Sequence, residues 1–197
     1  MDSILEVNGL VKRYPAFFLD NISFSLPEGC VLGFIGANGA GKTTTIRSIL
    51  NLAHKDAGTI KIFGLDTVKH EQEIKDRIGI VMDGSYFYNE LSMQDMKSII
   101  APAYSKWSDA DYRSYMEKFE LDPKQKISTL SKGMRMKFAL VLALSHQAEL
   151  LIMDEPTAAL SGVEIEQLFA IIRRLKAKGV GIVYISHRMQ EIPQIGD

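Results

Sequence analysis

The sequence predicts an α/β fold with a central, mainly parallel sheet, an N-terminal antiparallel β layer and an inserted helical subdomain. Residues 4–7 and 22–26 alternate apolar and polar side chains, the period of half-buried antiparallel strands. The stretch 86–147 instead shows helical spacing at 93–101 and 109–119. Four short apolar runs are typical of strands buried on both faces of a parallel sheet, and they lie at 30–35, 78–82, 150–153 and 180–185.

The composition is that of an ordinary globular chain. Its 197 residues are 46% hydrophobic and 24% charged, with a formal net charge of −1, so one domain is expected over 1–197. We expect 1–85 and 148–197 to form the core of this domain and 86–147 to be the helical insertion. The balanced charge and the lack of a long Lys/Arg run argue against nucleic acid as a ligand.

The cysteine and hydropathy patterns exclude further classes. Cys30 is the only cysteine, which excludes an intramolecular disulfide and a cysteine-based zinc site and fits a reducing cytoplasm. Because Cys30 lies in an apolar run, we expect it inside a buried strand. The N-terminus has no leader-like pattern, and no segment approaches eighteen uninterrupted apolar residues. The sequence therefore predicts no membrane-spanning helix.

A glycine-rich run after the predicted strand 30–35 has the spacing of a phosphate-binding P-loop. The glycines let backbone N–H groups turn toward the phosphates, Lys42 supplies a positive charge, and Thr43 supplies a hydroxyl ligand for Mg²⁺. Residues 44–50 form a predicted helix whose positive N-terminal end faces the same anion. The sequence thus predicts a P-loop NTPase. The expected phosphate-binding residues are Gly36, Ala37, Asn38, Gly39, Ala40, Gly41, Lys42, Thr43 and Thr44.

Two carboxylates follow the apolar run at 150–153. The carboxyl edge of an open α/β sheet is where ligands bind, so Asp154 and Glu155 are expected beside the P-loop. Asp154 is predicted to hold Mg²⁺, and Glu155 to accept a proton from the attacking water. An Asp-Glu pair is weak evidence by itself, and it gains weight because a bound Mg-nucleotide needs an acidic partner.

Two further helices are expected beside the sheet. Apolar residues recur at helical spacing from Ile165 to Leu175, and Gly179 stands where this crossover helix should end. Another helix begins after Ser131, a candidate N-cap, and runs to Leu144. The aromatic residues of the insertion are expected to form a small satellite core rather than a docking surface. They are Tyr104, Trp107, Tyr112, Tyr115 and Phe119.

The segment 130–134, taken together with the P-loop and the two carboxylates, resembles the signature motif of ATP-binding cassette (ABC) ATPases. The resemblance covers nearly the whole chain, with the motifs in family order. It implies ATP and Mg²⁺ as ligands, and a head-to-tail dimer in which Ser131 and Gly133 grip the γ-phosphate bound by the opposite subunit. It also implies that Tyr14 stacks on adenine and that His187 contacts the γ-phosphate and orients the catalytic Glu155.

Three positions depart from the family pattern. Asp83 stands where a glutamine is usual; the resemblance makes it a candidate Mg²⁺ ligand and catalytic residue, or a charge that weakens hydrolysis. Lys132 replaces a glycine of the signature. Ser161 replaces an aspartate in 157–161, which resembles the D-loop, and this puts communication between the two sites in doubt. Family domains commonly continue well beyond the histidine that His187 matches, so the resemblance leaves open a truncation after Asp197.

The resemblance implies an ATP hydrolase subunit that powers a membrane transporter. The residues at 33–36 and 130–134 are most similar to those of multidrug or antibiotic exporters, so export is the expected direction. The implied partners are a separately encoded transmembrane permease and a second ABC ATPase subunit, identical or different. The chain would then be cytoplasmic and peripheral on the inner face of the cell membrane. One alternative is a soluble ABC-type switch acting on a ribosome or DNA, and another is a kinase-like phosphotransferase.

Overall fold

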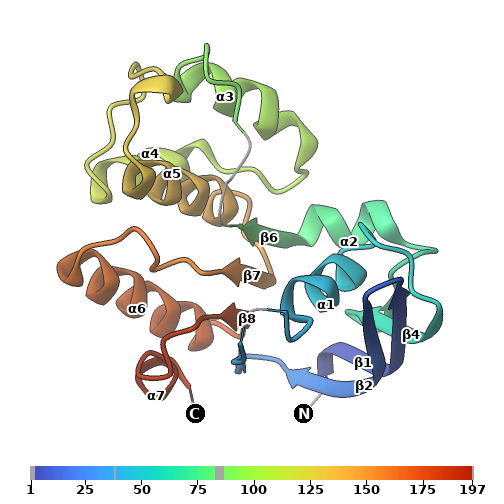
Figure 1. Cartoon of the computed structure of the whole chain (residues 1–197). Coiled ribbons are helices and arrows are strands. Elements are labelled where there is room, and N and C mark those ends of the chain that lie inside the picture. Colours follow the sequence, from blue (N-terminus) through green and yellow to red (C-terminus); the bar gives the residue numbers. More distant parts are fainter. Residues whose placement is uncertain (1–2, 38, 83–86, 197) are drawn as a thin grey trace.

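The computed structural model describes residues 3–37, 39–82 and 87–196, which form two four-stranded sheets and the helices around them (Figure 1). The first sheet is antiparallel and the second is parallel, as the sequence predicts. The helices between residues 93 and 144 lie above the parallel sheet in Figure 1, and the antiparallel sheet lies below it at the lower right.

The antiparallel sheet has the strand order β2-β1-β4-β5. Val7 of β1 pairs with Phe24 of β2 and with Ile60 of β4, so alternate apolar side chains share one face. That face is buried, with Leu5, Val7 and Ile62 fully covered. The strands are β1 (Ser3–Tyr14), β2 (Phe17–Pro27), β4 (Ala57–Ile62) and β5 (Leu65–Asp66).

The parallel sheet has the strand order β3-β8-β7-β6. Its central strands are buried almost throughout, and the edge strand β6 is buried at three of its four residues, whereas the other edge strand, β3, is half-buried along its length. The expectation that Cys30 lies inside a buried strand is wrong: the strand begins at Val31, and Cys30 is half-buried. The strands are β3 (Val31–Phe34), β6 (Ile78–Val81), β7 (Leu150–Asp154) and β8 (Gly181–Ile185).

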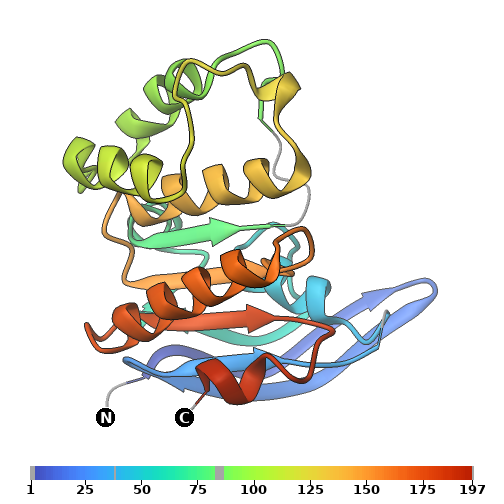
Figure 2. The same cartoon turned by 90° about the vertical axis from the view of Figure 1, so that its left-hand side faces the viewer.

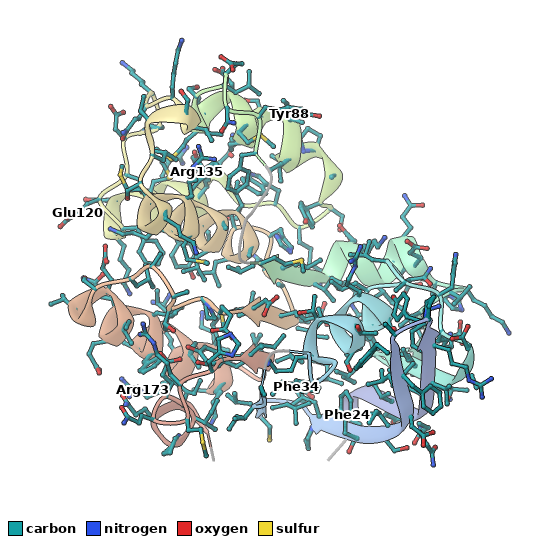
Figure 3. The ribbon with its side chains drawn as sticks, in the orientation of Figure 1. Phe24, Phe34, Tyr88, Glu120, Arg135 and Arg173 are labelled. Atoms are coloured by element: carbon teal, nitrogen blue, oxygen red, sulfur yellow. The ribbon has the colours of Figure 1, made fainter. Side chains whose placement is uncertain are left out.

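Two hydrophobic clusters lie on opposite faces of the parallel sheet. Ile152 and Val183 point into the cluster that the sheet shares with the antiparallel layer and with helix α1 (Lys42–Ile49). Their neighbours Leu151 and Ile182 point into the other cluster, because strand side chains alternate between faces. Phe24 and Phe34 pack edge to face at 5.2 Å between ring centroids, which ties the antiparallel layer to β3 (Figure 3).

The helical region contains helices α3 (Met93–Ile100), α4 (Asp109–Lys118) and α5 (Lys132–Leu144). Tyr112 and Phe119 are buried, which confirms the expected core role. The cluster is not a separate satellite, however, because it continues through α5 into the core beside the parallel sheet.

The remaining helices complete the chain. Helix α6 (Gly162–Lys176) is the predicted crossover helix, and Gly179 beyond its end has a φ of 87°. Helix α2 (Glu71–Arg77) precedes β6, and the short α7 (Ile192–Ile195) follows β8 and lies at the lower edge of the molecule in Figure 2. Among the described helices, none combines the length and the apolar character needed to span a bilayer.

Candidate nucleotide site

A cleft of about 800 Å³ lies where the P-loop meets the carboxyl ends of β7 and β8. It gathers residues that are far apart in the sequence, because parallel strands end at the same edge of a sheet. The structure therefore brings together most of the residues that the sequence singles out. The lining residues are Tyr14, Ala16, Phe17, Gly39, Ala40, Gly41, Lys42, Thr43, Thr44, Arg47, Asp154, Glu155 and His187.

The P-loop has the backbone conformation that its glycines permit. Gly39 and Gly41 have φ values of 84° and 92°, a region that other residues rarely adopt. A Cβ at Gly41 would also lie 2.9 Å from side-chain atoms of Phe17, so the loop is packed as well as turned. Lys42 Nζ donates to the carbonyl oxygens of Gly36 and Ala37 at 2.5 and 3.1 Å, which places the ammonium group inside the loop. Asn38 lies outside the described residues.

Helix α1 begins at the P-loop and presents its N-terminus to the cleft. Gly41 is its N-cap residue and makes no side-chain cap, and the first turn carries no acidic residue. Backbone N–H groups at Thr43 and Thr44 are therefore available to an anion, and the helix dipole favours negative charge there. These features fit a bound phosphate.

Glu155 and His187 meet at the other wall of the cleft. Glu155 follows β7 with a φ of 50°, and its backbone N–H donates to the Ile185 carbonyl at 3.0 Å. His187 Nε2 lies 3.0 Å from Glu155 Oε1, and the His187 backbone N–H donates to Oε2 at 3.4 Å. Burial raises the pKa of Glu155, and His187 opposes this rise. Oε1 is buried, and its contact with His187 Nε2 is that of an ion pair rather than of an aligned hydrogen bond. A carboxylate oxygen has two lone pairs, so Oε1 can still accept a proton or hydrogen bond from a ligand.

The residues present fit Mg²⁺ bound together with a nucleotide. Thr43 and Asp154 line the same cleft, and Mg²⁺ in such sites uses few protein ligands plus phosphate oxygens. No cluster of three or more His, Cys, Asp or Glu residues that could hold a metal alone occurs in the part of the chain that the structure describes. Asp83, the third expected metal ligand, lies outside that part.

Tyr14 stands at the mouth of the cleft, at the end of β1. Its ring is 44% exposed, and Lys12 Nζ lies 5.2 Å from the ring centroid. An exposed aromatic face beside a phosphate site fits base stacking. Phe17 and Arg47 also line the cleft, although sequence reasoning missed them. Arg47 lies one helical turn after Thr43, a spacing that could have indicated the shared face.

Ser131 and Gly133 do not line the cleft of their own chain, as far as the described residues go. Ser131 is the N-cap of α5 and accepts a hydrogen bond from the Met134 N–H at 3.2 Å, as predicted. A Cβ at Gly133 would lie 2.7 Å from the Ala159 carbonyl oxygen. The α5 N-terminus therefore packs against 157–161 and presents its donors elsewhere.

The Ser161 departure has a structural role. Its hydroxyl accepts a hydrogen bond from the Glu164 N–H at 3.4 Å, while Glu164 accepts from the Ser161 N–H at 2.8 Å, a capping box that starts α6. Lys137 of α5 lies 2.6 Å from Glu164, and together with the hydrogen bonds from Ser161 it lowers the pKa of that carboxyl to about 2. Serine thus performs the helix-capping role for which aspartate is equally suited.

A second cleft, of about 430 Å³, lies between the sheet and the helical region. Its lining is mainly apolar, with Arg47, Thr43 and Asp154 at the end that adjoins the nucleotide cleft. Residues from α3, the following turn and α5 form the opposite wall: Ile100, Tyr104, Ala139, Leu142 and Ala143.

Comparisons with known proteins agree with this geometry. The family model described as "ABC transporter" matches residues 19–158. The galactose/methyl galactoside import ATP-binding protein MglA of Escherichia coli K12 is 34% identical over 98% of the chain and 40% of that protein, and the Shigella flexneri protein matches equally. The chain thus spans about 40% of the length of these relatives.

Solved structures share the fold. An ATP-binding subunit of an ABC transporter superposes with a TM-score of 0.92 and 29% identity, over 99% of this chain and 84% of the other. The dimeric, post-hydrolysis ATP-binding cassette MJ0796 bound to ADP and Pi superposes at 0.84 with 20% identity, over 96% and 90% of the two chains. Because the family model covers more than half of its residues, and the P-loop, the two strand-end carboxylates and His187 line one cleft, the chain belongs to the ABC transporter family.

Proposed function

We propose that this chain is the ATP-binding and ATP-hydrolysing part of a membrane transporter and acts through head-to-tail dimer closure. The observation that carries the proposal is the single cleft in which the P-loop, Asp154 and the Glu155–His187 pair meet. A kinase-like phosphotransferase would need neither the signature segment 130–134 nor His187, whereas an ABC ATPase uses both.

The residues divide the chemistry between them. Lys42 and the N–H groups of the α1 N-terminus bind and orient the β and γ phosphates. Thr43 and Asp154 hold Mg²⁺, which when bound neutralises charge that develops on the phosphates. Glu155 accepts a proton from the attacking water at Oε1, and His187 orients that carboxylate.

The position of the signature residues supports the proposed dimer. Ser131 and Gly133 lie outside their own chain's nucleotide cleft, so their helix N-terminus has no phosphate to bind within one subunit. A second subunit in head-to-tail arrangement places these donors on the γ-phosphate of the opposite site. The site is therefore incomplete without its partner copy, whether identical or different.

The second cleft supports a separately encoded permease as the membrane partner. Its apolar walls join the nucleotide cleft through Thr43, Arg47 and Asp154, so a helix seated there would sense closure around ATP. We propose that the chain is peripheral on the inner face of the membrane, with 86–147 as the helical insertion between the two parts of the core.

The direction of transport needs a separate measurement. The sequence-based expectation of an exporter gains no support from the relatives, which are named for import of galactose and methyl galactoside. Direction and cargo depend on the permease, so vesicles that contain the complex are required. We therefore propose transport without a direction.

Calorimetric titration with Mg-ATP tests the proposal. The chain is expected to bind ATP and release phosphate, and Lys42→Ala is expected to abolish both, whereas Lys118→Ala, on the exposed surface of α4, should change neither. Absence of binding heat with well-folded protein would overturn the proposal. Copurification with a polytopic membrane protein supports the transporter role, whereas copurification with ribosomes or DNA would favour the alternative of a soluble switch.

A further inference from the structure

Glu191 is a buried carboxylate that accepts hydrogen bonds from three hydroxyl groups. Its side chain is 6% exposed, and Arg188 lies 3.6 Å away. The Thr157 hydroxyl donates to Oε1 at 2.7 Å, while the hydroxyls of Ser186 and Tyr184 donate to Oε2 at 2.7 and 2.9 Å. A buried carboxylate is tolerated only when its oxygens are satisfied in this way. Glu191 is therefore the centre of a polar cluster in an otherwise apolar part of the core.

The donors come from the two segments that carry the proposed catalytic pair. Thr157 lies two residues after Glu155, and Ser186 directly precedes His187. Three hydrogen bonds among the described residues join 155–161 to 185–191, and the bond from Thr157 to Glu191 is the shortest. The others are the 3.0 Å bond from the Glu155 N–H to Ile185 and the 3.4 Å bond from the His187 N–H to Glu155. The cluster thus ties the segments at a point behind the reactive side chains.

We propose that Glu191 is a positioning residue that holds the Glu155 segment and the His187 segment in one geometry. It touches neither nucleotide nor reacting water, because it is buried behind the cleft and is not among the lining residues. Its effect on rate rests on the proposed ATPase function, but its structural effect does not.

The backbone at Glu155 shows why such a support is needed. A φ of 50° is costly for a residue with a side chain and persists only where surrounding contacts impose it. The Ile185 bond fixes the Glu155 N–H, and the Thr157–Glu191 bond fixes the chain two residues later. Without Glu191 the turn between these points loses one of its two anchors, and Glu155 Oε1 leaves the position set against His187.

Hydrogen exchange measured by mass spectrometry tests the structural part without ATP. Glu191→Ala is expected to raise amide exchange in both 155–161 and 186–191 and to leave 42–49 unchanged. The matched control Glu166→Ala, which removes an exposed carboxylate from α6, should alter none of these segments. Exchange that rises only in 186–191 would overturn the proposal. If Glu191→Ala does not fold, Thr157→Val replaces it, since valine keeps the volume and removes one donor.

Steady-state hydrolysis tests the consequence. Glu191→Ala is expected to lower kcat by about 10- to 100-fold, the cost of a misplacement of about 1 Å. The KM for ATP should stay within about threefold, because the P-loop is untouched. Glu191→Gln keeps one acceptor oxygen and should recover part of kcat. In the Glu191→Ala background, Thr157→Val should have no further effect, because both changes remove the same tie.

The outcomes separate the two proposals. A parent chain that fails to hydrolyse ATP would refute the proposed function, and the exchange data would still decide the role of Glu191. A parent chain that hydrolyses ATP, with Glu191→Ala equal to it in kcat and in exchange, would overturn the role of Glu191 alone. A raised KM with an unchanged kcat would also overturn it, because that pattern indicates a binding role.

Discussion

Replacing Glu155 with glutamine separates ATP binding from hydrolysis. The substitution keeps the shape of the side chain and removes the proton acceptor at Oε1, the buried oxygen 3.0 Å from His187 Nε2. Loss of a positioned general base typically costs 10²- to 10⁴-fold, which corresponds to about 3 to 5 kcal/mol in activation free energy. Lys42 and the α1 N-terminus are unchanged, so ATP affinity should stay within about threefold. Glu155→Gln should therefore bind Mg-ATP normally and accumulate as a dimer.

Three measurements on one preparation decide this prediction. Phosphate release gives kcat, calorimetry gives the Kd for Mg-ATP, and size-exclusion chromatography with light scattering gives the mass in saturating Mg-ATP. Glu166→Gln, which removes an exposed charge on α6, is the matched control and should behave like the parent. A Glu155→Gln protein that hydrolyses ATP at the parent rate and remains monomeric would refute the assignment of the general base.

Three further predictions follow from the contacts around the site. Gly133→Ala places a methyl group 2.7 Å from a backbone carbonyl oxygen; urea unfolding should show a loss of about 1 to 3 kcal/mol, and an unchanged midpoint would argue against this close packing. Lys137→Met removes the main cause of the low pKa of Glu164, about 2 against an ordinary 4.5, so the stability from that ion pair is present above pH 4.5 and disappears as the pH falls toward 2. Because Glu164 is 26% exposed, we expect a deficit of about 1 kcal/mol at pH 7, and a deficit that persists at pH 2 would contradict the ion pair as its cause. The family departures at Asp83, Lys132 and Ser161 predict pairing with a second, different ATPase subunit, which cooperative hydrolysis by the purified chain alone would argue against.

The sequence predicts the parallel sheet well because its strands are buried on both faces. Unbroken apolar runs such as Leu150–Met153 have few alternatives to a central strand, and the structure places β7 there. Cys30 was expected inside a strand because it lies in the apolar run 30–35, and such a run does not show at which residue the strand begins. Strand β4 was not predicted, because only Ile60 and Ile62 mark its buried face, a signal too short to separate from a loop.

Part of the candidate site could be predicted from local sequence, and part depends on contacts between distant residues. The P-loop is contiguous in the sequence, so its spacing alone predicts a phosphate site. The contact between Glu155 and His187 joins residues 32 apart and depends on the parallel pairing of Asp154 with Ile185, which no local pattern encodes. The buried position of Glu191 could not be predicted from the sequence, because a glutamate in a polar stretch is usually exposed to solvent. Only the packing of Thr157, Tyr184 and Ser186 around it shows that it is buried.

The edge position of β3 has a consequence for biosynthesis. Within the described chain this strand has one neighbour in its sheet, and Val31 meets Ile182 there across about three quarters of the polypeptide. When the glycine-rich loop has just emerged from the ribosome during translation, the chain still lacks the strand that pairs with β3, next to this loop. Pairings between segments so far apart form late and leave open edges exposed in the meantime. The binding pocket should therefore mature only after translation has passed residue 185, and chaperone contact is expected during that interval.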